Sequence, residues 1–207
     1  ASSTMTLTGF NGQLFQNDRL IYFASRTQEG KGVIQVIDIS DPVMPKMRGK
    51  FVSDLPENTH VNNIFQVDHD LFVVHLRGYF GYCIACAFSL EGPLPSATSD
   101  ELAVIDLSDP DNPRLASRFN LGGYYSTGEL KSRGRIVYFS ANKVDKNTSR
   151  NYLVRVDLSN PAHPNKLPEI NIPGSLIDIS HNGHYIYTSD NVLTENRSQF
   201  TLFASAL

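Results

Sequence analysis

The stretch Ile37-Asp38-Ile39-Ser40-Asp41-Pro42 recurs twice further along the chain. The other copies are Ile105-Asp106-Leu107-Ser108-Asp109-Pro110 and Val156-Asp157-Leu158-Ser159-Asn160-Pro161. A second proline follows three residues after the first in every copy: Pro45, Pro113 and Pro164. A pattern of this length that returns three times indicates an internal structural repeat.

Each copy of this motif predicts a β-strand that ends in a fixed turn. The aliphatic residues alternate with polar ones, which places them on one face of a strand. Ser and Asp or Asn then offer side-chain oxygens to the backbone, and proline presets φ near about −65° for the turn. The second proline has no N–H, so it ends the first strand and begins another extended segment. The expected second strands are Lys46–Phe51, Arg114–Phe119 and Lys166–Ile170.

Two more strands are expected before each motif. Apolar strands that follow polar turns are expected at Leu20–Phe23, Leu71–Val74, Ile136–Phe139 and Tyr185–Thr188. The turn before the last of these contains Asn182-Gly183, a strong hairpin signal. Shorter strands precede these turns, for example at Asn63–Val67 and Leu176–Ile179. A complete unit therefore has four antiparallel strands.

Four such units predict an all-β fold, a β-propeller built of four-stranded antiparallel blades. We expect one propeller domain over residues 1–207, with blade one at about 11–54, blade two at about 58–122, blade three at about 123–174 and a partial blade four at about 175–207. Blade four lacks the Ser-Asp-Pro turn and the last strand, whereas Met5–Phe10 matches the strand that elsewhere follows the turn. Two hypotheses follow. Either residues 5–10 complete blade four in a four-bladed ring, or the chain is part of a larger propeller.

The connection between the second and third strands of each unit varies in length. It is long in blade two, between His75 and Glu101, and short in blade one, from Arg26 to Lys31. In blade three we expect an intermediate loop at 141–150. One face of the molecule is therefore predicted to carry variable loops.

Composition narrows the class of protein. With 41% apolar and 19% charged residues, the 207-residue chain is typical of a soluble globular protein. A net charge of −3 provides no basic field for nucleic acid. No stretch approaches the roughly 20 apolar residues that a transmembrane segment needs. The small-residue start at Ala1, without Met, is typical of signal-peptide removal or of an expression product, which suggests a secreted, periplasmic or cell-surface location.

The repeated strings also resemble a known family. Val33–Pro42 and Leu102–Pro110 are similar to the LVIVD repeat of bacterial and archaeal secreted or surface propellers. The resemblance implies a propeller fold and an extracytoplasmic location, and it brings no common catalytic residues. The third copy departs from the pattern where Arg155 replaces an aliphatic residue, which affects the expected packing of that strand.

The two cysteines, Cys83 and Cys86, lie in the long connection of blade two. A CxxC pair can be a redox motif, but such motifs usually open a helix in a βαβ unit, which this sequence does not show. We therefore expect a structural disulfide or two free thiols. Haem attachment would need His after Cys86, and Ala87 stands there.

The loop of blade three offers a weak calcium site. Asp145, Asn147 and Ser149 place oxygen side chains at alternate positions, as a calcium loop does, but the glycine and the later bidentate Glu are missing. We expect a solvated hairpin loop, with calcium binding as the alternative, and the sequence predicts no other cofactor. Glycosylation sequons begin at Asn147 and at Asn196.

The sequence contains no recognisable catalytic motif. The six histidines show no HExxH spacing, although inner strands of several blades can bring ligands together at a propeller axis. We expect them in hairpins and turns, with a metal site as the alternative. The sequence has no GxSxG elbow, P-loop or dinucleotide fingerprint.

Two aromatic-rich segments are the best candidates for a contact surface. Tyr79, Phe80 and Tyr82 lie in the long connection of blade two, and Tyr124 and Tyr125 begin blade three. Packing beneath a long loop is the alternative. We therefore expect a non-catalytic secreted or cell-surface module that binds a protein or glycan partner, or docks with remaining blades or another chain of the same propeller. The alternative is an enzyme or enzyme subunit with a ligand or metal site on the propeller axis.

Overall fold

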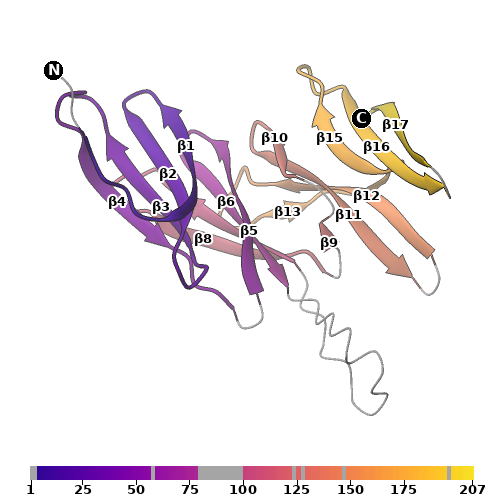
Figure 1. Ribbon diagram of the computed structural model, residues 1–207, viewed down its shortest axis with the longest axis horizontal. Helices are drawn as coiled ribbons and strands as arrows, with labels where there is room; N and C mark the ends of the chain where they lie inside the picture. Colours follow the sequence, from indigo (N-terminus) through magenta and orange to yellow (C-terminus); the bar gives the residue numbers. More distant parts are fainter. Residues whose placement is uncertain are drawn as a thin grey trace, which may run out of the picture. The chain divides into compact units, whose positions relative to one another are not determined.

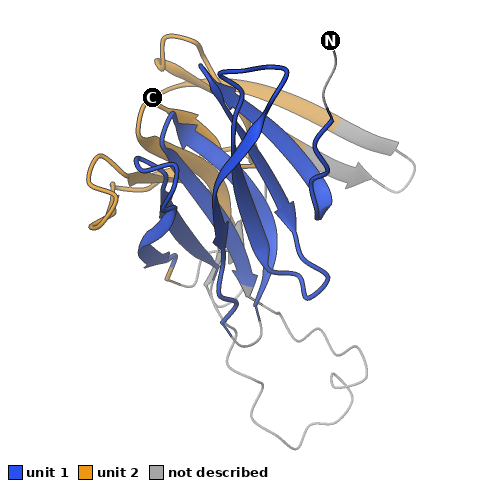
Figure 2. Cartoon of the chain, turned by 90° about the vertical axis from the view of Figure 1, so that its left-hand side faces the viewer, with its two compact units in different colours: residues 1–121 blue, residues 122–207 orange. Residues whose placement is uncertain are grey.

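The computed structural model describes residues 4–56, 59–78, 100–122, 125–126, 129–145, 148–194 and 197–207. Every regular element in these ranges is a β-strand, and the strands pair antiparallel into four separate sheets (Figure 1). The sequence prediction of an all-β fold made of propeller blades is confirmed. Contacts divide the chain into two compact units, residues 1–121 and 122–207 (Figure 2).

Unit 1 contains two four-stranded meanders, in which each strand pairs with the next one along the chain. Blade one consists of β1 (Phe10–Asn17), β2 (Leu20–Arg26), β3 (Gly32–Asp38) and β4 (Lys46–Val52). Blade two consists of β5 (Thr59–Asp68), β6 (Leu71–Gly78), β7 (Glu101–Asp106) and β8 (Arg114–Asn120). The strands expected on both sides of the double-proline turns are present.

Unit 2 contains a blade with interrupted edges and a three-stranded blade. Blade three consists of β9 (Tyr125–Ser126), β10 (Lys131–Arg133), β11 (Ile136–Asp145), β12 (Thr148–Asp157), β13 (Asn165–Lys166) and β14 (Ile170–Asn171). The pairs β9/β10 and β13/β14 form its first and last strands, since β9 and β10 pair with β11, and β13 and β14 with β12. Blade four consists of β15 (Ser175–Ile179), β16 (Tyr185–Thr194) and β17 (Arg197–Ala206), with no fourth strand in the described residues.

Two details of blade three differ from the sequence prediction. The strand expected over 166–170 is split into β13 and β14 on either side of Pro168, because proline cannot donate to the ladder. Arg155, the unusual residue of the third repeat, donates from Nη2 to the carbonyl of Pro168 at 2.8 Å. The intermediate loop expected at 141–150 is instead mostly strand, since β11 and β12 stay paired as far as Asp145 and Thr148.

The segment before blade one also differs from the prediction. Residues 4–9 lie outside every strand, and only Phe10 of the expected strand belongs to β1. The carbonyl of Thr8 accepts a hydrogen bond from the Gln35 side chain at 3.1 Å, so the segment contacts blade one through a side chain and not through a strand ladder. The closing of blade four by residues 5–10 stays a prediction.

The core of unit 1 lies between the faces of its two blades. Ile34 and Val36 of blade one are fully buried in one cluster with Phe72 and Ile105 of blade two. The ring of Phe72 contacts Phe15 edge-on, with centroids 5.3 Å apart. Aromatic contacts of this kind add about 0.5–1.5 kcal/mol to the area that they bury.

Unit 2 has a smaller core of the same kind. Leu153 of blade three packs with Leu176, Ile179 and Ile186 of blade four. From blade three, Arg133 also donates through Nη2 to the carbonyl of Ile179 at 2.6 Å. In both units, therefore, one blade covers a face of the next.

The repeated motif forms the same turn three times. In blade one, the Ser40 N–H donates to the Asp38 carboxylate at 2.8 Å, and the Val43 N–H donates to the Asp41 carboxylate at 2.9 Å. The corresponding bonds to the first carboxylate in blades two and three measure 2.9 and 2.8 Å. Asp or Asn therefore accepts from the backbone, as expected. Serine was expected to accept from the backbone as well, whereas the bond seen at this position is the one that the Ser40 N–H donates to Asp38, two residues earlier.

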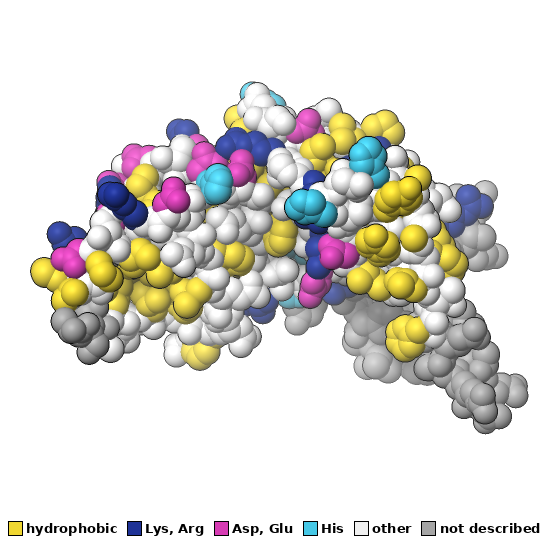
Figure 3. Space-filling view, turned by 90° about the horizontal axis from the view of Figure 1, so that it is seen from above, with side chains coloured by type: hydrophobic (Ala, Val, Ile, Leu, Met, Phe, Trp, Pro, Cys, Tyr) yellow, Lys and Arg dark blue, Asp and Glu magenta, His cyan; other side chains and the backbone are white. Residues whose placement is uncertain are grey.

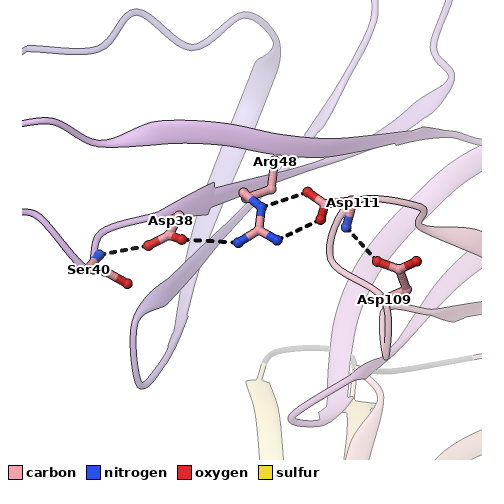
Figure 4. A network of polar contacts seen from close by, with 5 residues as sticks. All are labelled: Asp38, Ser40, Arg48, Asp109 and Asp111. Atoms are coloured by element: carbon pink, nitrogen blue, oxygen red, sulfur yellow. Dashed lines mark hydrogen bonds and ion pairs between the residues drawn. The ribbon is translucent and has the colours of Figure 1, made fainter.

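An arginine joins two of these turns within unit 1 (Figure 4). Arg48 of β4 donates through Nε and Nη2 to both carboxylate oxygens of Asp111, each at 2.6 Å. Its Nη1 donates to Asp38 at 3.1 Å. Two-pronged pairing of this kind fixes orientation as well as distance, so it aligns the turn of blade two with the outer strand of blade one.

Gly49, next to Arg48 on β4, permits this close approach. A Cβ at this position would overlap the carbonyl oxygen of Pro110 and lie 2.6 Å from Cδ of Pro113. Gly49→Ala is therefore expected to destabilise the protein by about 1–3 kcal/mol, the usual cost of overpacking. Urea unfolding measures the loss. Lys46→Ala removes an exposed side chain from the same strand and should change stability little; equal losses in both variants would contradict this account.

The turn carboxylates also predict acid sensitivity. Hydrogen bonds from Ser40 and Ser159 lower the pKa of Asp38 and Asp157 below the ordinary value of 3.8. A lowered folded pKa contributes stability that is present above the unfolded value and is lost as the pH falls through the folded value. Unfolding followed between pH 7 and pH 2 should therefore show stability falling below about pH 4, with a shallower fall for Asp38→Asn. Asp190→Asn removes an exposed charge outside the turns; if its slope changed as much, the turns would not be the cause.

Candidate functional site

The aromatic contact surface predicted from the sequence lies outside the described residues. This is true of Tyr79, Phe80, Tyr82 and Tyr124, and of Tyr125 only the backbone is described, in β9. The cysteines Cys83 and Cys86 and the sequon residues Asn147 and Asn196 also lie outside. Asp145 and Ser149 belong to β11 and β12, and their side chains are not described. The contact surface, disulfide, calcium site and glycosylation sites stay predictions.

A buried polar pair marks the base of the long connection in blade two. His75 of β6 and Asp100, directly before β7, are 1% and 0% exposed. Nε2 of His75 lies 3.2 Å from a carboxylate oxygen of Asp100. The connection leaves β6 after Gly78 and returns at Asp100. The pair therefore ties together the two ends of this connection.

Asn62 of β5 sets the tautomer of His75. Its Nδ2 lies 3.1 Å from Nδ1 of His75. Because an amide nitrogen can only donate, Nδ1 accepts, and Nε2 carries the hydrogen that is donated to Asp100. Both ring nitrogens are engaged, so His75 is not placed to act as a general base or as a metal ligand. Among the described residues, no group of three His, Cys, Asp or Glu side chains could hold a metal ion.

Arg26 connects this buried network with the surface. From the end of β2, its Nη2 donates to the backbone carbonyl of Asn62 at 2.8 Å. Burial lowers the pKa of the nearby His60 imidazole below its ordinary value, and the positive charges of Arg77 and Arg26 lower it further. Arg26 and Arg77 therefore both act on His60 at this end of unit 1.

A cavity of about 440 Å³ opens beside Arg26. Its polar lining includes Lys50, Gln28 and Glu29, and its apolar lining includes Phe10 and Val33. Cavities of about 300–1,000 Å³ with a few polar groups are typical of small-ligand sites. A hydrogen bond from the Thr27 side chain lowers the pKa of Glu29, which keeps this carboxylate ionised. The cavity therefore combines two cations, one anion and an aromatic ring.

Arg26 also lines a second, much smaller cavity. It has a volume of about 30 Å³, enough for a water molecule, and polar side chains such as Gln13 and Asn63 line it. Ser25, which also lines it, is 1% exposed, and its hydroxyl oxygen has no hydrogen-bond partner in the described structure. A water or a polar ligand atom would satisfy this group.

Comparison with known families places these observations in context. The family model of the LVIVD repeat matches residues 30–52, 97–121 and 148–169. The chain carries three LVIVD repeats. The first two LVIVD repeats each span a third strand, the double-proline turn and a fourth strand, and the last ends within the interrupted edge of blade three. A comparison with curated proteins finds no match.

The sequence did not point to Arg26 or Lys50, which line the cavity. It also did not reveal the buried pair, because metal and catalytic motifs have short fixed spacings, whereas His75 and Asp100 are 25 positions apart. The position of the variable loops could have pointed to these residues, since Arg26 begins the shortest loop and His75 precedes the longest one. The described residues contain no helix with the length and hydrophobicity that crossing a membrane requires.

The electrostatic environment of His60 gives a direct test of this geometry. A lowered folded pKa means that the unfolded chain binds the proton more readily, so stability should decrease as the pH falls through 6.5. Arg77→Gln should raise the pKa of folded His60, measured by NMR titration of the imidazole, because one positive charge is removed. Arg114→Gln removes a charge that does not act on His60 and should leave the titration unchanged. A wild-type midpoint at or above 6.5 would contradict the described environment.

Proposed function

We propose that the protein is a non-catalytic, secreted or cell-surface binding module, and that the cavity beside Arg26 receives an acidic group of a glycan or protein partner. The observation that carries the proposal is the 440 Å³ cavity with Arg26 and Lys50 in its lining. Two cations against the single carboxylate of Glu29 favour a ligand with negative charge. Phe10 adds an apolar surface, on which a sugar ring or an apolar side chain can pack.

The hydrogen bonding of His75 favours binding over catalysis. A general base needs a ring nitrogen that can take a proton from a substrate. Asn62 and Asp100 engage both nitrogens of His75, and the pair is buried. Its role is to hold the base of the long connection, so the aromatic residues predicted there would be presented from a fixed anchor. The secreted location is proposed from the family resemblance.

The two lysines of β4 provide a matched test. Lys50 lines the cavity, whereas Lys46 lies on the same strand outside it. Lys50→Gln should weaken the binding of a uronic-acid oligosaccharide or an acidic peptide by roughly fivefold, since an exposed ion pair contributes about 1 kcal/mol or less. Lys46→Gln should not change it. Isothermal titration calorimetry, with the neutral oligosaccharide and a neutral peptide as reference ligands, measures both effects.

Two results would refute the proposal. One is that neither acidic ligand binds more tightly than its neutral counterpart. The other is equal weakening by Lys50→Gln and Lys46→Gln, which would place the effect in the net charge of the strand and not in the cavity. Unfolding curves of both variants establish that they remain folded.

A further inference from the structure

A β-bulge in blade one opens the smaller of the two cavities beside Arg26. In the ladder of β1 and β2 the register shifts between Phe10 and Gln13, so two residues of β1 lie opposite Ser25 alone. One of them, Asn11, has a left-handed backbone with φ of 51°, a conformation that asparagine adopts more readily than most residues. Bulges interrupt strand pairing and re-aim side chains, and they are frequent next to functional sites.

This cavity has a volume of about 30 Å³ and lies between blades one and two. Its polar lining comes from β1, β2 and β5: Asn11, Gln13, Ser25, Arg26 and Asn63. The space holds one group of the size of a water molecule or a halide ion, and it is too small for an extended ligand. The cavity is therefore a site for a single small ligand.

The Ser25 hydroxyl lies at this cavity without a hydrogen-bond partner among the described residues. Ser25 is only 1% exposed. The backbone of Gly9 packs directly against it, because a Cβ at Gly9 would overlap Oγ of Ser25. A buried hydroxyl without a partner is destabilising, so a ligand that accepts its hydrogen stabilises the folded state.

The chemistry of the lining favours an anion. The described residues that line the cavity include a guanidinium, three amides and a hydroxyl, and no carboxylate. Arg26 carries a permanent positive charge and only donates hydrogen bonds, whereas the amides and the hydroxyl can turn an N–H or O–H toward a ligand. A hard metal cation would take only the oxygen atoms of these groups and would face the guanidinium. A small anion gains from both the charge and the donors.

The charge of Arg26 has no counter-ion in the part of the chain that the structure describes, since no salt bridge there joins it to a carboxylate. Its Nη2 donates to the neutral backbone carbonyl of Asn62. By contrast, Arg48 and Arg114 each contact an aspartate, and basic and acidic side chains stand beside one another over unit 1, on the left of Figure 3. The nearby Glu29 lines the larger cavity and not the small one.

The buried carboxylate of Asp100 does not contact this guanidinium directly. It accepts from Nε2 of His75, whose Nδ1 accepts from Asn62. Asn62 in turn meets Arg26 through its backbone carbonyl. Three hydrogen bonds therefore lie between the carboxylate and the guanidinium, whereas an anion in the cavity would lie beside Arg26 itself.

We propose that the small cavity binds one halide ion, such as chloride, which accepts hydrogen bonds from Ser25, Arg26 and the amide groups of the lining. Because the lining residues belong to both blades, the ion joins blade one to blade two and stabilises unit 1. The inference goes beyond the acidic ligand of the larger cavity and does not depend on it, since the two linings have only Arg26 in common.

Chloride-dependent stability tests the proposal. Thermal unfolding of the full chain is compared at equal ionic strength in sodium chloride, in sodium bromide and in sodium methanesulfonate, whose anion is too large for the cavity. The two halides should raise the unfolding temperature, as a ligand that binds only the folded state does, and methanesulfonate should not. Ser25→Ala should weaken halide binding by roughly tenfold, the usual effect of losing a hydrogen bond to a charged group. In methanesulfonate this variant should be at least as stable as the wild type, because it removes an unsatisfied hydroxyl.

Two glutamines of β1 provide a matched control. Gln13→Ala removes a side chain of the lining and should also reduce the effect of the halides. Gln16→Ala removes an exposed side chain of the same strand that is not part of the lining, and it should leave the effect unchanged. Anomalous scattering from crystals soaked in bromide locates the ion, and the expected peak lies beside Oγ of Ser25.

Any of three results overturns the proposal. Equal stability of the wild type in halide and in methanesulfonate would show that the cavity holds water only. An equal effect of the halides on the wild type and on Ser25→Ala would place anion binding elsewhere on the protein. Bromide peaks at exposed cations alone would show an adventitious ion only.

Discussion

A sheet of four short strands has apolar side chains on both faces and cannot shield either of them alone. In unit 1, a neighbouring blade provides the cover: Phe72 of blade two packs on Ile34 of blade one. In unit 2, Leu176 of blade four covers Leu153 in the same way. This need for a covering sheet explains why the units repeat along the chain.

The repeated turn serves the same need. An aspartate at the end of the third strand accepts the N–H of the serine two residues later, which directs the chain back as a fourth strand. In unit 1 the turn also contacts the neighbouring blade, because Arg48 holds Asp111 and Gly49 leaves room for Pro110. One short motif therefore shapes a blade and helps to stack it. Its carboxylates have lowered pKa values because they accept these bonds.

The loop end of unit 1 combines rigidity with an open, charged surface. His75 and Asp100 hold the base of the long connection from within, and Arg26 extends from the same network to the cavity. Sequence spacing could not reveal this arrangement, because the residues belong to different strands and loops. The histidines were recognisable in the sequence as candidate functional residues. Only the fold shows that both ring nitrogens of His75 have hydrogen-bond partners and that two arginines act on His60.

The sequence by itself determined the features that depend on neighbours along the chain. Alternating aliphatic residues, the Ser-Asp-Pro turns and Asn182-Gly183 act over a few residues, so most of the strands and hairpins in the described residues could be predicted. Where strands were wrongly predicted, at residues 5–9 and across Pro168, the pairing partner or the backbone donor was lacking. Only the tertiary structure decided which apolar side chains of neighbouring blades pack together and where Arg26 and Lys50 meet around a cavity. Burial and charge at these positions depend on side chains that are distant in sequence, and packing alone brings such side chains together.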